Sequence, residues 1–228
     1  GPINDLISVN SDIYFTNKYM LIKYNIKNQL LTRFPINDLG SDELLQITYN
    51  GEKIIYMLTK DGKIFDFNIN DNSNTLRFDS NKGYDFSKND KVSKISYIED
   101  KFLFATKNGW IYLYNANSKN LEFNQKYLAH DSKINTLYYD KRLKTLYSSA
   151  DDGSFCIVEL NEGNTFSEKR VDIDFGSNSI ITDIKSYKYN DKDYILTSDI
   201  NGNLSYWDLE ISKMFELIKK RVLRKPLN

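Results

Sequence analysis

Cysteine and histidine are almost missing from this sequence, which has one of each, Cys156 and His130. A single cysteine excludes an internal disulfide and is typical of a reducing compartment, so we expect Cys156 to be a buried structural thiol. A zinc site of the usual kind needs three or four Cys or His ligands, which this sequence cannot supply without carboxylates in their place. We therefore expect no metal site.

Long apolar runs and an excess of one charge are also missing. No apolar run approaches the length of a transmembrane helix, which takes about 18 residues, and no secretory signal is recognisable. The 31 basic and 31 acidic residues balance, and the sequence pI is near 6.8. This balance gives no global electrostatic case for binding nucleic acid. These features predict an intracellular protein, cytoplasmic or nuclear, that does not bind membranes.

The loops that hold phosphates or calcium are missing as well. Neither a Walker A sequence nor Gly-x-Gly-x-x-Gly occurs. The run Asp-Asp-Gly at 151–153 has a superficial likeness to a calcium loop, but it lacks the further oxygen ligands and the closing Glu. A hairpin turn explains this run better, and we expect no cofactor.

The feature that is present is a repeat. Asp-Gly or Asn-Gly recurs at Asp61-Gly62, Asn108-Gly109, Asp152-Gly153 and Asn201-Gly202, at intervals of 47, 44 and 49 residues. Each pair lies between stretches rich in β-branched and aromatic residues, which are typical of strands. Both pairs accept the positive φ of a two-residue hairpin turn. A hairpin that recurs about every 40–50 residues indicates the blades of a β-propeller.

Two of the repeats resemble the WD-repeat family. Trp207-Asp208 ends a third strand, where the family has its Trp-Asp pair, and Ala129-His130 resembles the family's Gly-His step. Asp152 stands in the turn position of the family's structural Asp. The resemblance implies that His130, Asp152, Trp207 and Asp208 are structural. The fourth repeat has Val where the family has Trp, so the full His–Ser–Asp–Trp hydrogen-bond network is not expected there.

The predicted fold class is all-β, a β-propeller of about five WD-like four-stranded blades with a C-terminal helix. We place the propeller at residues 3–210, with blades at about 3–36, 42–79, 91–127, 130–176 and 179–210. Residues 211–228 are expected to form the helix and a basic tail, and Gly-Pro at 1–2 matches the remnant of a cleaved expression tag. The first blade is the most diverged, because its turn lacks Gly. Its strands are expected at 7–9, 12–16, 19–25 and 30–34.

The end of the fifth repeat differs from the others. It has no fourth strand, and an apolar spacing of helical type follows it. The propeller is therefore not expected to be closed by its own last strand. Because proteins generally protect an open sheet edge, we expect the helix 212–224 to cover the fifth blade. The next alternative is a strand or blade from a partner chain.

Candidate partner-binding residues fall in three places. Trp110 begins a strand at the rim, and it is either wedged between blades or exposed as a binding anchor. The long segment 79–90 carries Tyr84 and Phe86, either as a binding loop or as a polar insertion whose aromatics pack on the blade. The basic tail carries Lys219, Lys220, Arg221 and Arg224. It packs on the last blade, docks with a protein or an anionic surface, or serves as a nuclear-localisation or nucleic-acid patch.

The resemblance to WD-repeat proteins implies a non-catalytic interaction scaffold, a subunit of a larger assembly whose partners are other proteins. One alternative is a nucleic-acid-associated propeller that uses the basic tail and the rim aromatics. Another is a glycosidase-like enzyme, which needs two carboxylates about 5–10 Å apart. The expected inner strands carry Lys94, Asn135, Thr136, Asp183 and Lys185. Because Asp183 is the one acid expected near the channel, we predict no enzyme.

Overall fold

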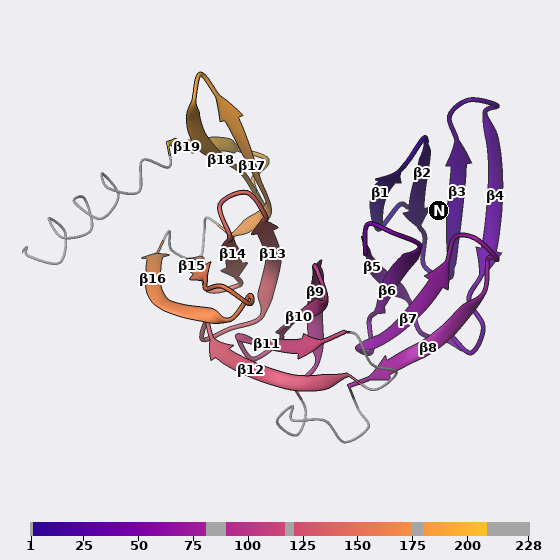
Figure 1. Ribbon diagram of the computed structural model, residues 1–228, viewed down its shortest axis with the longest axis horizontal. Helices are drawn as coiled ribbons and strands as arrows, with labels where there is room; N and C mark the ends of the chain where they lie inside the picture. The colour runs from indigo at the N-terminus through magenta and orange to yellow at the C-terminus, as the bar shows by residue number, and fades with distance from the viewer. Residues whose placement is uncertain (1, 81–89, 117–120, 175–179, 209–228) are drawn as a thin grey trace, which may run out of the picture.

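Five antiparallel β-sheets make up the structure, a computed structural model that describes residues 2–80, 90–116, 121–174 and 180–208. The sheets stand as blades around a shared channel, and the first strand of each blade lines it (Figure 1). This arrangement confirms the predicted all-β propeller of five blades. The predicted helix 212–224 lies outside the described residues. Within the described ranges, no helix is long and apolar enough to cross a membrane.

Blades 1 to 4 have four strands each, and the described part of blade 5 has three. Within a blade the strands follow one another in sequence order, each antiparallel to the next. The strands are β1 (Asp5–Val9), β2 (Asp12–Thr16), β3 (Met20–Asn25) and β4 (Leu30–Pro35) in blade 1; β5 (Leu44–Tyr49), β6 (Ile54–Thr59), β7 (Lys63–Asn68) and β8 (Asn74–Asp79) in blade 2; β9 (Val92–Ile98), β10 (Lys101–Thr106), β11 (Trp110–Asn115) and β12 (Glu122–Leu128) in blade 3; β13 (Ile134–Asp140), β14 (Thr145–Ala150), β15 (Ser154–Leu160) and β16 (Phe166–Asp174) in blade 4; and β17 (Ile181–Tyr189), β18 (Lys192–Asp199) and β19 (Leu204–Asp208) in blade 5.

Tight turns between the second and third strands set the repeat. The four turn glycines predicted from the sequence have φ between 79° and 83°, a range that L side chains rarely adopt. Blade 1 has no such glycine. There the side chain of Asn17 accepts hydrogen bonds from the backbone N–H groups of Tyr19 (3.0 Å) and Met20 (3.1 Å). This Asx turn closes the hairpin in place of the glycine.

The apolar core lies between the blades. In the described residues, four buried clusters each join two consecutive blades. At the junction of blades 4 and 5, Tyr147 and Phe155 pack against Ile181, Ile184 and Ile195. Burying a side chain of this size stabilises the fold by about 1.5–3 kcal/mol. Each blade is therefore held mainly by the faces of its neighbours.

Side-chain hydrogen bonds to the backbone also tie each blade to the inner strand of the next. The ties run from Asp5 to Ile47 (2.9 Å), from Gln46 to Ile95 (2.9 and 3.1 Å), from Ser93 to Ile134 (2.8 Å) and from Ser149 to Ile181 (3.0 Å). A bond of this kind occurs at every junction between consecutive blades. These bonds fix how the inner strands are placed around the channel.

In the residues that the structure describes, the ring of blades is open. Figure 1 shows blades 1 and 5 at opposite ends of an arc, with the other blades between them. Blade 5 packs on blade 4 through β17, which contacts β13 and β14. On its other face, Leu204 and Tyr206 are 73% and 72% exposed. In the described part of the chain, no strand joins blade 5 to blade 1.

Candidate functional site

Blade 5 presents one of its two sheet faces to solvent, and we call this surface the free face. Ile184 and Ile195 are buried against blade 4, and the residues that alternate with them in the strands point to the opposite side. Three rows of cross-strand neighbours make up the free face. They are Asp183–Ser198–Leu204, Lys185–Leu196–Tyr206 and Tyr187–Tyr194–Asp208.

The free face occupies a position that is covered in blade 4. Counted from the turn glycine, Leu204 and Tyr206 correspond to Phe155 and Ile157. Phe155 is 4% exposed and Ile157 packs on the same cluster, because blade 5 covers them. No described blade covers the two corresponding residues of blade 5. Leu196, Leu204 and Tyr206 form an exposed apolar patch on this face, and such a patch is typical of an interaction surface.

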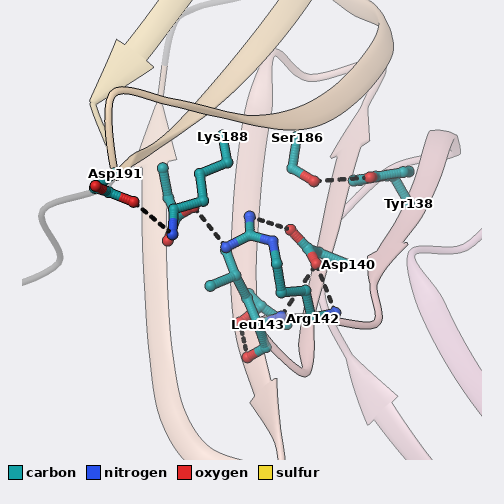
Figure 2. A network of polar contacts seen from close by, with 9 residues as sticks. Tyr138, Asp140, Arg142, Leu143, Ser186, Lys188 and Asp191 are labelled. Carbon is teal, nitrogen blue, oxygen red and sulfur yellow. Dashed lines mark hydrogen bonds and ion pairs between the residues drawn. The ribbon is translucent and has the colours of Figure 1, made fainter.

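A polar network holds blade 5 on blade 4 and so orients the free face (Figure 2). Arg142 donates a hydrogen bond to Asp193 of blade 5 (2.5 Å), and it lies 3.4 Å from the buried carboxylate of Asp140. The hydroxyls of Tyr138 and Ser186 are 2.8 Å apart across the same junction. Since Arg142 is nearly half exposed, its ion pairs contribute about 0.2–1 kcal/mol each. The network positions blade 5, whereas the apolar cluster supplies most of the stability.

The inner strands line a polar channel of about 630 Å³. The lining includes the residues expected from the sequence, Lys94, Asn135, Thr136, Asp183 and Lys185. It also includes a second acid, Asp5, which the sequence argument missed. Burial raises the pKa of the Asp5 carboxyl and lowers the pKa of Lys94, because a desolvated charge is unfavourable.

The first inner strand begins earlier than the sequence predicted, which explains why Asp5 was missed. The expected strand was 7–9, but β1 starts at Asp5, which pairs with Thr16. The carboxylate holds this extension in place, because it accepts backbone N–H bonds from Leu6 and Ile47, each at 2.9 Å. Oδ2 of Asp5 therefore joins blade 1 to blade 2, while Oδ1 is engaged within blade 1.

His130 lies between blades 3 and 4, and both of its ring nitrogens have partners. Nε2 is 2.8 Å from Ser148 Oγ, and Nδ1 is 2.5 Å from Ser154 Oγ. Ser154 in turn donates to the carboxylate of Asp152 (2.5 Å). Ser154, which the sequence argument missed although it follows the turn glycine, therefore links the predicted structural His and Asp. The hydroxyl on Nε2 belongs to Ser148, which is buried and so is not presented to a substrate.

The pKa of the Asp152 carboxyl is lower than the usual value for aspartate. Burial disfavours its ionised form, but hydrogen bonds from the side chain and backbone of Ser154 outweigh burial and lower the pKa of Asp152. A folded-state pKa below the unfolded value stabilises the protein above the ordinary pKa of aspartate. That contribution is lost as the pH falls through the folded-state pKa.

Replacing His130 with Ala is expected to lower the free energy of unfolding by about 1–3 kcal/mol, because it leaves the buried Ser148 hydroxyl without its partner. Urea unfolding followed by tryptophan fluorescence measures the loss. The exposed neighbour Asp131 is the control, and Asp131→Ala should change stability by less than about 0.5 kcal/mol. Unchanged stability together with lost partner binding would contradict a structural role for His130.

Trp110 begins β11 and is half-buried. Its indole packs against the core cluster that joins blades 2 and 3. Lys126 Nζ lies 4.9 Å from the ring centroid, within the range of a cation–π contact. One part of the ring therefore contacts the core between blades, as the wedge interpretation predicts, while the rest stays at the rim. Its role in partner binding stays a prediction.

Replacing Trp110 with Ala is expected to cost about 1–3 kcal/mol of unfolding free energy, below the range for a fully buried Trp. Lys126→Ala is the matched control, since it removes only the cation–π contact, and it should cost about 0.5–1 kcal/mol. Thermal unfolding of both variants distinguishes the interpretations. If Trp110→Ala has normal stability but binds partners less, the indole is an anchor and not a wedge.

Trp207 and Asp208 both bind within blade 5. Trp207 Nε1 donates to the hydroxyl of Thr197 on the neighbouring strand (3.2 Å). Lys192 Nζ lies 3.5 Å from the carboxylate of Asp208. These contacts join the strands of blade 5. The structural role that the resemblance implies for Trp207 and Asp208 stays a prediction.

The remaining predicted binding residues lie outside the described residues. They are Tyr84, Phe86, Lys219, Lys220, Arg221 and Arg224. In the parts of the chain that the structure describes, no three His, Cys, Asp or Glu side chains come together as metal ligands would.

The blades, the Asp-Gly and Asn-Gly turns and the hydrogen bonds of His130 and Trp207 define a WD-like β-propeller. A family model named Beta-prop_Vps41, described as "Vps42 beta-propeller", matches residues 76–207, which is more than half of the chain. The chain therefore belongs to this Vps41-type β-propeller family.

A solved structure has a similar fold. A chain in the "Crystal Structure of Mitotic Checkpoint Complex" matches with a TM-score of 0.67 and 10% sequence identity. The match covers 90% of this chain and 61% of that chain, so this chain spans less than two thirds of its length. At this identity the likeness shows the fold alone. No curated protein matches the sequence.

Proposed function

We propose that this chain is a non-catalytic protein-interaction scaffold, a subunit of a larger multiprotein assembly, and that it binds a partner through the free face of blade 5. The exposure of Leu204 and Tyr206, at positions that are covered in blade 4, carries the proposal. Membership of the Vps41-type propeller family and the fold shared with a chain of the Mitotic Checkpoint Complex support a role in assemblies.

The chemistry of the channel also favours binding over catalysis. A glycosidase needs one carboxylate to protonate the leaving group and another to attack or activate water. Asp5 uses both of its oxygens to accept backbone N–H bonds. Among the described residues that line the channel, Asp183 is then the one acid with a carboxylate oxygen that accepts no hydrogen bond. A single available carboxylate does not make such a pair.

The proposal predicts that acidic substitutions on the free face remove the partner and spare the fold. The full chain, with Leu204→Asp and Tyr206→Asp combined, is purified through a tag from cells that normally express it. Proteins that co-purify are quantified against the wild-type chain. We expect the partner to fall at least about tenfold, because buried apolar anchors supply most interface energy. Thermal unfolding of the free variant should match the wild type, since both side chains are already exposed.

Leu76→Asp is the matched control. Leu76 is an exposed leucine on β8, the outer strand of blade 2. Blades 3 and 4 separate it from blade 5 and its free face. This variant should keep every partner. If the free-face variant also keeps every partner at wild-type levels, blade 5 is not the binding surface.

A further inference from the structure

We propose that the free face of blade 5 binds a further β-blade supplied by a different polypeptide. Asp183 accepts a backbone hydrogen bond from the innermost strand of that blade. The inference rests on the proposed function and names the kind of partner. Its support is that two independent features of the free face, an apolar surface and a polar acceptor, repeat what joins the blades within this chain.

The apolar residues of the free face resemble residues that a neighbouring blade covers elsewhere in this chain. Leu196, Leu204 and Tyr206 correspond to Leu103, Ile111 and Leu113 of blade 3. The blade 3 residues are fully buried, because blade 4 covers them with aliphatic residues of its first two strands. Blade 5 covers blade 4 in the same way. The covering residues are Ile134, Leu137 and Leu146 in blade 4, and Ile181, Ile184 and Ile195 in blade 5.

These two junctions define the pattern that a partner needs. In both covering blades, the inner strand has aliphatic residues at its first and fourth positions, and the next strand contributes a third. A strand pair with that spacing lays three aliphatic side chains on the free face. The partner is therefore a β-blade with this pattern.

Asp183 supplies the polar acceptor. In blade 1, one carboxylate oxygen of Asp5 accepts the N–H of the following residue, Leu6, and the other accepts the N–H of Ile47 in the next blade. Asp183 repeats the first of these bonds, because its Oδ1 accepts the N–H of Ile184 at 2.8 Å. Among the described residues, its Oδ2 has no hydrogen-bond partner.

The position of Asp183 in its strand indicates which N–H it would accept. Gln46 is the third residue of β5, as Asp183 is the third residue of β17, and Gln46 accepts the N–H of Ile95, the fourth residue of β9. Asp5 likewise accepts the N–H of Ile47, the fourth residue of β5. Asp183 is thus placed to accept the N–H of the fourth residue in the partner's inner strand.

A second copy of this chain fits the free face less well. Its blade 1 would have to cover the free face with the outer side of β1. Ile7 and Val9 of β1 pack toward blade 2, which leaves Leu6 and Ser8 on that outer side. One aliphatic residue then stands where the covering strands of blades 4 and 5 have two.

Photo-cross-linking tests the identity of the occupant. The full chain carries p-benzoylphenylalanine at position 204, or at position 76 as the control, in cells that normally express it. We expect a cross-link from position 204 to a strand of another polypeptide that has aliphatic residues three positions apart and a hairpin after it. A cross-link to a second copy, to a helical segment or to nothing would overturn the proposal.

An added blade tests the same surface with a defined probe. A second copy of residues 129–174, which contains the four strands of blade 4, is appended after Asn228 of the full chain. We expect the unfolding temperature to rise, and the rise to disappear when Leu204→Asp and Tyr206→Asp are included. The co-purifying partner should be displaced at least about tenfold. Equal unfolding temperatures, or a partner that still binds, would show that the free face does not take a blade.

Substitution of Asp183 tests the acceptor. Asp183→Ala should weaken partner binding about tenfold, the effect of losing one hydrogen bond to a charged group, and Asp183→Asn should weaken it less because one acceptor oxygen remains. The unfolding temperature of the free chain should not change. Full partner binding by Asp183→Ala would refute this contact. A partner that is lost with Leu204→Asp and Tyr206→Asp but kept with the added blade would leave the scaffold proposal standing and remove the blade proposal.

Discussion

Gly109→Ala is expected to destabilise the fold by about 2–5 kcal/mol. Gly109 follows Asn108 in the turn of blade 3 and has φ of 81°, where an L side chain costs about 1–2 kcal/mol. A Cβ at this position would also lie 1.8 Å from the carbonyl oxygen of His130, which is backbone and cannot rotate away. The close approach is part of the fold, because the N–H groups of Ala129 and His130 both donate to the Gly109 carbonyl (3.0 and 3.1 Å). Relieving the overlap requires a backbone shift that breaks this contact.

Gly202→Ala is the matched control. Gly202 occupies the same turn position in blade 5, with φ of 79°, but nothing lies within 4 Å of its added Cβ. This variant should lose only about 1–2 kcal/mol of unfolding free energy, the cost of a side chain at positive φ. Urea unfolding of both proteins measures the difference. If both variants lose the same unfolding free energy, the backbone of His130 does not lie as close to Gly109 as the structure shows.

The blades could be predicted from the sequence because the turn requirement is local. A positive φ between two apolar strands restricts the residue type at the turn itself, so Asn201-Gly202 indicates a hairpin without knowledge of its surroundings. The resemblance at His130 was informative for the same reason. Blade 1 is less regular because Asn17 makes its turn through side-chain hydrogen bonds, which the sequence pattern does not specify.

The free face could not be predicted from the sequence, because its exposure depends on which blades lie beside it. Leu204 and Tyr206 alternate along β19 as core residues do, and the sequence does not say which face a neighbouring blade covers. The same holds for Trp110, whose packing depends on cluster residues from two blades. Asp5 was missed because the strand was expected to start later than it does. The sequence-based candidates were aromatic or basic residues in loops and tails, whereas the exposed apolar face lies on strands.

Truncating corresponding residues in blades 4 and 5 should therefore lower the free energy of unfolding by different amounts. Phe155 and Leu204 each stand two residues after the turn glycine, on the same side of their sheets. Phe155→Ala should lower the free energy of unfolding by about 3–5 kcal/mol, because it opens a cavity between blades 4 and 5. Leu204→Ala should change it by less than about 0.5 kcal/mol, because the side chain already lies in water.

Urea unfolding of the free chain and of the partner complex completes this prediction. In the complex, Leu204→Ala should become costly, because its side chain is then buried by the partner as Phe155 is buried by blade 5. Truncation of Phe155 should cost the same in both states, since its cover belongs to this chain. If Leu204→Ala is already as costly as Phe155→Ala in the free chain, the face is covered without a partner and blade 5 is not open. If it stays neutral in the complex, the partner binds elsewhere. The difference between the two states therefore measures directly how much of the free face a partner buries.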